Sequence, residues 1–316
     1  MAEDKIIRSL QEAVGKRAPL KSRTNALRLV NSFGDDLDGL VLEQYGRHCV
    51  AQVFEEHWLK EQRLLADFVK EELGAEYFLI KDRTQSASSK PDAIRMNVLI
   101  DSGSSRTIVE EDGIKFEVDM NDTLNTGLFL DMRANRKVVG ERARGRKVLN
   151  TFAYTCSFGV HARAGGASAV VNVDISRKNL ERGRINYQLN QLPSAENEFI
   201  RADAVQYLER AVKKDNRFDL IILDPPSFAR HEGKVFSVKK DLAHLLRMAI
   251  AVLEPDGTLF VATNYSEMTH DYLEGLIETE ARDRAIKKIE RFGQDEDFVG
   301  SGLMPESYLA ALLVEL

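Results

Sequence analysis

Short apolar stretches alternate with helical patterns through the middle of the chain. Four stretches lead into polar or acidic positions: 148–149 before Asn150, 169–173 before Asp174, 198–201 before Asp203 and 218–223 before Asp224. Strands joined through helices form parallel sheets, because the crossover helix returns the chain in the same direction. The pattern therefore predicts an α/β domain whose ligand crevice lies at the carboxyl ends of these strands.

Three further runs complete a predicted seven-stranded sheet: 258–263 as the fifth strand, and 285–292 with 307–315 as a closing pair. Five parallel units followed by such a pair are the order expected of a class I methyltransferase (Rossmann-like) fold rather than of a dehydrogenase. The glycine-rich dehydrogenase fingerprint is also absent, because the loop after the first strand has no glycine before Gly159.

The first third of the chain has a different pattern. Apolar residues at helical spacing over 6–14, ended by Gly15, predict a short amphipathic helix. Short alternating runs follow, with a hairpin at Asp112 and Gly113 and a helix over 58–73, and they predict a small, mainly antiparallel sheet. We therefore divide the chain into an N-terminal helix and extension (1–24), a small α+β domain (25–120) and the large domain (121–316).

The composition, 43% hydrophobic and 30% charged over 316 residues, is that of a chain able to bury a large core. No apolar run approaches the roughly 20 residues of a membrane span, and the charged start is unlike a signal peptide. We therefore expect a cytoplasmic protein without membrane contact. The two cysteines, Cys49 and Cys156, lack metal-ligand spacing and support neither a disulfide framework nor a metal site.

The net charge of −6 argues against nucleic-acid binding through bulk electrostatics alone. Basic clusters nevertheless occur at 16–23, 142–147 and 177–184. Each cluster alone is typical of a solvated surface. Together they allow a phosphate-lined approach to the crevice.

Acidic residues at the strand ends suggest nucleoside binding. Asp174, directly after the second strand, is placed to accept hydrogen bonds from both ribose hydroxyls of a nucleoside cofactor. Asp203, followed by Ala204, is placed to meet an adenine amino group.

A stronger signal is the run Asp224, Pro225, Pro226, Ser227 and Phe228 after the fourth strand. Two consecutive prolines fix the backbone and remove two donors, so that the carbonyls beside them stay available to a target amine or ring. Phe228 offers a face on which a flipped base could stack. The alternative is a rigid turn after a buried strand.

Two other segments have simple structural alternatives. Asp131 and Arg133 lie beside a helix start in the hinge 125–136, where a helix cap with a surface ion pair would also explain them. Cys156 follows the first strand, but only His161 is near it, which disfavours a catalytic thiol.

Over about residues 25–316 the chain resembles the bacterial large-subunit (23S) ribosomal RNA methyltransferases of the RlmI and RlmK type, which are class I S-adenosylmethionine-dependent methyltransferases. The resemblance rests on these segments: 28–31 with 36–46, Thr126–Arg133, Asn150–Phe158, Gly165–Ala167, Val173–Ser176, Asp224–Phe228 and Pro305–Leu309.

The resemblance implies that S-adenosylmethionine is bound on one side by Phe129, Asp131 and Arg133. It further implies that the methionine moiety lies over Asn150, Phe152, Ala153 and Tyr154. The ribose would be held by Asp174 with Ile175 and Ser176, and the adenine by Asp203 with Ala204. Asp224 and Pro225 would border the transferring methyl group, with Pro226 and Phe228 completing the acceptor platform. The glycine usual in the first loop is Cys156 here.

The resemblance also bears on the acceptor. Relatives that methylate cytosine carbon 5 use a cysteine after the fifth strand, because a thiolate must first add to the ring. Residues 262–266 contain no cysteine. An asparagine after this strand, here Asn264, resembles the branch of the family that methylates guanine at nitrogen 7, in which the ring nitrogen attacks the methyl group directly. We therefore expect methylation of a ribosomal RNA base at a ring nitrogen. A protein or small-molecule acceptor, and a non-catalytic RNA-binding or ribosome-assembly protein, remain as alternatives.

Overall fold

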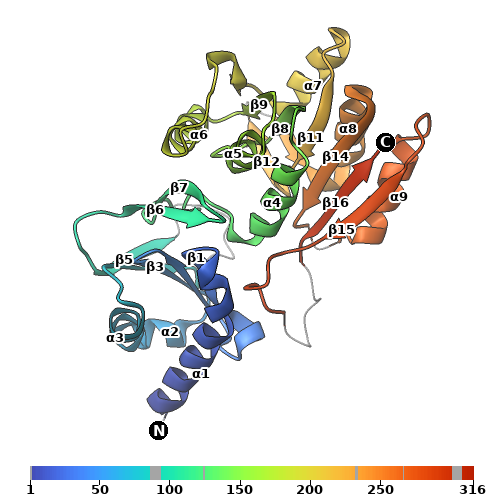
Figure 1. Ribbon diagram of the computed structural model, residues 1–316. Coiled ribbons are helices and arrows are strands. Elements are labelled where there is room, and N and C mark those ends of the chain that lie inside the picture. Colours follow the sequence, from blue (N-terminus) through green and yellow to red (C-terminus); the bar gives the residue numbers. More distant parts are fainter. Residues whose placement is uncertain (1, 86–93, 124, 232–233, 266, 301–307) are drawn as a thin grey trace. The chain divides into compact units, whose positions relative to one another are not determined.

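The computed structural model describes the chain except residues 1, 86–93, 124, 232–233, 266 and 301–307. The chain forms two compact units (Figure 1). The first comprises Met1–Arg133 and Asp295–Glu306, and the second Ala134–Gln294 and Ser307–Leu316. The first unit thus includes residues that lie beyond the predicted boundary at 120, because Thr126 Oγ1 donates to the Tyr45 hydroxyl at 2.9 Å and Arg133 pairs with Asp295 and Asp297. Pro305 and Glu306, which contribute to the resemblance noted from the sequence, lie outside the described residues.

The helices and strands of the first unit include every element expected from its sequence pattern. They are α1 (Ala2–Lys16), β1 (Ala26–Asn31), β2 (Leu40–Tyr45), β3 (His48–Val53), α2 (Glu56–Lys60), α3 (Gln62–Leu73), β4 (Tyr77–Asp82), β5 (Arg95–Ile100), β6 (Arg106–Glu111) and β7 (Ile114–Asp119), with short 3-10 turns at Ala18–Ser22, Ser32–Asp35 and Leu130–Met132. The helix predicted over 58–73 is broken at Glu61, which separates α2 from α3.

A five-stranded sheet in the order β1-β2-β3-β4-β5 forms the centre of the first unit. All its strand pairs are antiparallel except β3 with β4, which agrees with a mainly antiparallel sheet. One face packs on a core that includes Leu10 of α1, Leu27 of β1, Phe68 of α3 and Phe78 of β4. β6 and β7 form the predicted hairpin beside it.

The second unit alternates strands and helices. Its elements are α4 (Arg133–Glu141), β8 (Lys147–Thr151), α5 (Ser157–Ala164), β9 (Ala169–Asp174), α6 (Arg177–Leu189), β10 (Phe199–Arg201), α7 (Ala204–Lys213), β11 (Phe218–Leu223), β12 (Phe228–His231), β13 (Lys234–Ser237), α8 (Val238–Ala251), β14 (Leu253–Thr263), α9 (His270–Glu280), β15 (Lys288–Phe292) and β16 (Ala310–Glu315), with a 3-10 turn at Glu196–Glu198.

The predicted seven-stranded sheet is confirmed, in the order β10-β9-β8-β11-β14-β16-β15. β8 to β11 and β14 are parallel, and β16 pairs antiparallel with β14 and β15. Leu259 and Val261 face a core that α7, α8 and α9 complete. Phe260 points to the other face, where its ring lies 5.3 Å from that of Phe158 in α5. Helices therefore cover both faces, as a class I methyltransferase fold requires (Figure 1).

Candidate active site

The polar residues predicted at the strand ends of the second unit gather at one edge of the sheet. Thr151 at the end of β8 is in register with Val173 of β9 and Leu223 of β11, and Arg201 of β10 with Asp174. Since these strands are parallel, the loops that follow them leave the sheet on the same side. The strand ends therefore meet at one edge of the sheet, as the sequence predicts, and the ligand crevice at that edge stays a prediction.

Asp174 organises the loop after β8. Its Oδ2 accepts a hydrogen bond from the Tyr154 backbone N–H at 2.8 Å, and its Oδ1 one from the Ser176 N–H at 2.8 Å. Asn179 Nδ2 approaches Oδ1 at 3.4 Å. A carboxylate offers about four acceptor positions, so Oδ2 retains capacity for a ribose hydroxyl. Burial raises the pKa of this carboxyl above its ordinary value, against the lowering effect of these hydrogen bonds.

The loop that Asp174 holds has an unusual backbone. Phe152, Tyr154 and Cys156 have positive φ values of 52°, 48° and 60°. Such left-handed residues without glycine cost about 1–3 kcal/mol each and persist only where surrounding contacts fix them. Here the N–H of Ala153 donates to Val173 O at 3.0 Å, and that of Cys156 to Ala153 O at 2.7 Å. The loop is thus built to present its backbone in one conformation beside Asp174.

Asn150 lies within the sheet rather than in the loop. Its side chain is 1% exposed, and its Nδ2 donates to Asn172 Oδ1 at 2.9 Å on the neighbouring strand. Asn172 in turn donates to the Tyr187 hydroxyl at 3.1 Å. This buried amide chain was not predicted from the sequence. The contact of Asn150 with a cofactor stays a prediction.

Two helix caps occupy the predicted adenosine side of the crevice. Ser176 caps α6 by accepting from the Asn179 N–H at 3.3 Å, and Asp203 caps α7 by accepting from the Gln206 N–H at 3.0 Å. Ala204, at the first position of α7, is buried. Ile175 accepts at its carbonyl from Arg201 Nε at 3.3 Å, so its backbone is fixed beside Asp174.

The segment after β11 leads into an antiparallel pair of short strands, β12 and β13, that was not predicted from the sequence. Asp224 is half-buried, Pro225 buried and Pro226 exposed. Ser227 Oγ donates to Asn264 Oδ1 at 2.6 Å, which links the ends of the neighbouring strands β11 and β14. Phe228, 53% exposed, begins the hairpin β12–β13. An exposed aromatic residue thus directly follows in sequence the serine that is hydrogen-bonded to Asn264.

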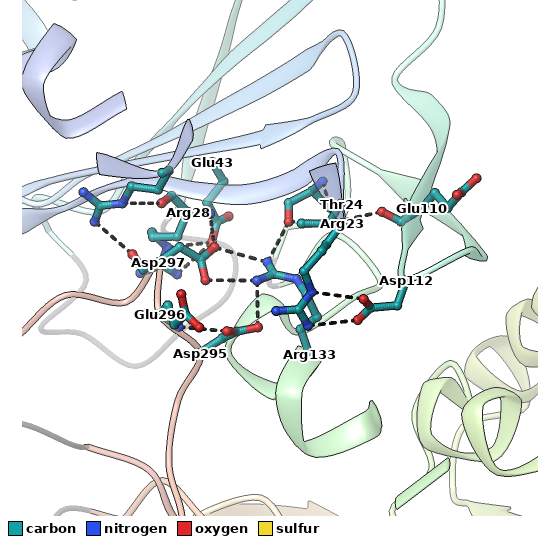
Figure 2. A network of polar contacts seen from close by, with 12 residues as sticks. Arg23, Thr24, Arg28, Glu43, Glu110, Asp112, Arg133, Asp295, Glu296 and Asp297 are labelled. Carbon is teal, nitrogen blue, oxygen red and sulfur yellow. Dashed lines mark hydrogen bonds and ion pairs between the residues drawn. The ribbon is translucent and has the colours of Figure 1, made fainter. Parts of the chain in front are cut away.

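The other three predicted cofactor ligands, Phe129, Asp131 and Arg133, belong to the first unit. Phe129 is 40% exposed. Arg133 is fully buried: its Nη1 lies 2.7 Å from Asp295 Oδ2 and 3.2 Å from Asp297 Oδ1, and its Nη2 donates to Ala26 O at 2.7 Å (Figure 2). The ion pair of this segment is therefore buried rather than on the surface. The role of these three residues at a cofactor stays a prediction.

Neither thiol has the properties of a nucleophile. Cys49 and Cys156 are both fully buried. Burial raises the pKa of Cys49 to about 12 and that of Cys156 well above its ordinary value.

Within the described ranges, no group of three or more His, Cys, Asp or Glu side chains could hold a metal ion. None of the described helices combines the length and apolarity that crossing a bilayer requires.

Comparison with known proteins agrees with this geometry. The family model described as "S-adenosylmethionine-dependent methyltransferase" matches residues 86–315. "Putative ribosomal RNA large subunit methyltransferase YwbD" of Bacillus subtilis is 33% identical, over 97% of this chain and 79% of that protein. "Ribosomal RNA large subunit methyltransferase I" of Photobacterium profundum is 30% identical, over 96% of this chain and 78% of that protein.

A solved structure is similar over nearly the whole chain. The crystal structure of SMU.776, described as "a putative methyltransferase complexed with SAH", has a TM-score of 0.89 and 27% identity, over 99% of this chain and 82% of that one. The resemblance noted from the sequence motifs is thereby confirmed, and a non-catalytic protein is not favoured. The chain belongs to the S-adenosylmethionine-dependent methyltransferase family, and its cofactor is S-adenosylmethionine.

Proposed function

We propose that the protein methylates a base of large-subunit ribosomal RNA at a ring nitrogen, with guanine nitrogen 7 as the acceptor atom. The names of the relatives from Bacillus subtilis and Photobacterium profundum support ribosomal RNA as the substrate. Asp174 with Ile175 and Ser176, Asp203 with Ala204, and the loop from Asn150 to Tyr154 would hold the cofactor, together with Phe129, Asp131 and Arg133.

The observation that carries the proposal is the arrangement after β11 and β14. The Asp224–Phe228 segment offers a fixed backbone and an exposed ring. Asn264, which accepts a hydrogen bond from Ser227, follows the fifth strand, and cytosine carbon 5 enzymes of the family that this chain resembles have their cysteine nucleophile after that strand. Asparagine cannot act as that nucleophile, and both cysteines of the chain are buried. Neither cysteine is therefore a candidate for forming a covalent adduct with a cytosine ring. A ring nitrogen needs no such adduct, because it attacks the activated methyl group directly and requires only alignment and desolvation.

The test is methyl transfer from labelled S-adenosylmethionine to ribosomal RNA from cells that lack this protein, followed by nucleoside analysis. We expect the label in 7-methylguanosine, and Asp224→Ala should remove it. Label in 5-methylcytidine, or no label in RNA despite cofactor binding, would overturn the proposal. The second outcome would move the search to protein or small-molecule acceptors.

A further inference from the structure

Helix α6 lies in close contact with the loop that follows β8. A Cβ added at Gly183 would lie 2.4 Å from Cys156 Sγ and 2.9 Å from Cys156 Cβ, so the approach depends on a glycine at this position. Asn186 lies three positions further along α6 and therefore on the same side of the helix. Its side chain is fully buried, as is that of Thr155 in the loop. The side of α6 that contains Gly183 and Asn186 thus borders the loop directly.

A buried hydrogen bond connects this side of α6 to the loop backbone. Asn186 Nδ2 donates to the carbonyl oxygen of Thr155 at 3.0 Å. Thr155 lies between two left-handed residues, Tyr154 and Cys156, and belongs to neither a helix nor a strand. A buried carbonyl outside regular secondary structure depends on partners such as side-chain donors. Asn186 supplies one from the neighbouring helix.

The residue before Thr155 is held from the same strand and helix. The Tyr154 N–H donates to Asp174 Oδ2 at 2.8 Å, and Asp174 Oδ1 accepts from the N–H of Ser176, which caps α6. Asp174 ends β9, and Asn186 lies within α6. Two successive loop residues are therefore fixed by one continuous segment of chain, the first through its N–H and the second through its carbonyl.

The loop needs this support because of its backbone conformation. Phe152, Tyr154 and Cys156 are left-handed at alternate positions, and such residues persist only where surrounding contacts fix them. Removing the Asn186 donor would leave the Thr155 carbonyl buried with one partner fewer. That loss favours loop conformations in which the carbonyl reaches water. In these conformations Cys156 would no longer pack against α6.

We propose that Asn186 is a positioning residue for the cofactor, which acts through the Thr155 carbonyl to keep the loop after β8 in the conformation that binds S-adenosylmethionine. The inference rests on the proposed function, in which the loop from Asn150 to Tyr154 holds the cofactor. When the binding conformation is only partly populated, the apparent Kd rises in inverse proportion to its population. Loss of the Asn186 donor should therefore weaken cofactor binding by the folded protein, beyond any effect on stability.

Calorimetric titration of the full chain with S-adenosylhomocysteine tests the proposal without turnover. Asn186→Leu keeps the size of the side chain but has no donor, and it should raise Kd about 3- to 10-fold, the effect of about one lost hydrogen bond. Asn186→Ala removes the donor without placing new methyl groups against the carbonyl, and it should raise Kd similarly.

Asn135→Leu is the matched control. Asn135 is also fully buried in the second unit, and its Nδ2 donates to a loop carbonyl, that of Gly293, at the same distance of 3.0 Å. Gly293 follows β15, at the opposite edge of the sheet from β10 and β9. The control should lower the free energy of unfolding about as much as Asn186→Leu does, but it should leave Kd unchanged.

Thiol labelling followed by mass spectrometry supplies a second readout, because Cys156 lies in the loop and Cys49 in the first unit. In Asn186→Leu, Cys156 should react about 3- to 10-fold faster with a disulfide reagent, with Cys49 unchanged. Saturating S-adenosylhomocysteine should restore the protection of Cys156. The labelling rate should depend little on urea, because local opening exposes far less surface than unfolding does.

Three results would overturn the proposal. Cys156 could stay protected in Asn186→Leu, or its labelling could rise only with unfolding. Asn186→Leu and Asn135→Leu could raise Kd equally, which would reduce Asn186 to a residue that only stabilises the fold. Selective labelling of Cys156 with an unchanged Kd would overturn the proposal for a different reason, because it would contradict the proposed place of the Asn150 to Tyr154 loop at the cofactor.

Discussion

The backbone N–H of Tyr154 lies 2.8 Å from Asp174 Oδ2, so the residue predicted to hold the ribose also fixes the loop predicted to lie under the methionine moiety. The two loops follow neighbouring parallel strands, β8 and β9. A single carboxylate therefore couples both halves of the cofactor site. Substitution of Asp174 should therefore affect the binding of both the ribose and the methionine moiety of the cofactor.

Asp174→Asn should weaken S-adenosylmethionine binding and change its pH dependence. The raised pKa means that the wild-type carboxylate is protonated at a higher pH than an ordinary Asp, whose pKa is 3.8, so acidification should weaken binding from a correspondingly higher pH. We expect a loss of at least about tenfold, or 1.4 kcal/mol, because a charge-assisted hydrogen bond is replaced. Calorimetric titrations across pH measure both effects. An acid limb that persists in Asp174→Asn would assign it to another group.

Phe228→Ala should raise KM for RNA while leaving cofactor binding unchanged. The ring is 53% exposed, so its removal should disturb the fold little. Stacking of a base on an aromatic ring contributes about 1–3 kcal/mol, which corresponds to roughly 5- to 150-fold in affinity. Steady-state kinetics on ribosomal RNA measure the change, with Phe228→Tyr as the control that retains the stacking face. An unchanged KM would show that the ring does not contact the acceptor.

Gly183→Ala should destabilise the protein through Cys156. A Cβ at position 183 would lie 2.4 Å from Cys156 Sγ, a distance that forces one of the two to move. Overpacking of this kind costs about 1–3 kcal/mol, partly offset by the higher helix propensity of Ala, about 1 kcal/mol. In a Cys156→Gly background the same substitution should no longer destabilise the protein, because the sulfur and the Cβ of Cys156, which would lie 2.4 Å and 2.9 Å from the added atom, are both absent. Urea denaturation of the four proteins measures the coupling, and an equal cost in both backgrounds would contradict it.

Arg133→Met should lower the free energy of unfolding by about 3–5 kcal/mol, because it leaves Asp295 and Asp297 buried without their cation. Arg106→Met, which breaks the exposed pair with Asp119, should cost no more than about 1 kcal/mol. Denaturant unfolding compares the two. A similar, small effect for both would mean that the cluster in Figure 2 contributes little to stability.

The two thiols should react slowly with a disulfide reagent at pH 8 in the folded protein. Both are buried, and burial holds the pKa of Cys49 at about 12, so almost no thiolate is present at that pH. Unfolding in denaturant should expose both and make the reaction fast. Rapid reaction of one thiol in the native protein would indicate an open conformation around it.

Much of the second unit could be predicted because its local patterns agree with its fold. The apolar runs before Asp174 and Asp224 are short, bounded by polar residues and separated by helices, which is enough to identify parallel strands. The acidic residues at the strand ends then follow from the geometry of a parallel sheet. The hairpin that begins at Phe228 escaped prediction, since the residues after Pro226 show no clear alternation of apolar and polar positions.

The first unit shows what local patterns cannot supply. Alternation along β3 can tell that Gln52 and Ala51 face opposite ways, but not that Gln52 meets Lys81 on β4 rather than another strand. Arg133 looked like a surface residue or a cofactor ligand, because its partners Asp295 and Asp297 lie far along the chain. Long-range polar clusters of this kind leave no signal within a short window of sequence.

The return of residues 295–300 to the first unit has a consequence for biosynthesis. A ribosome releases the chain from its N-terminus, and domains generally begin to fold in that order. Asp297, however, accepts hydrogen bonds from Arg133 and from the Arg28 backbone N–H, at 2.7 Å, and its own carbonyl accepts from Arg17 at 2.8 Å. The nascent first unit must therefore wait for translation of the entire span 134–294 before its buried guanidinium groups gain their full set of partners.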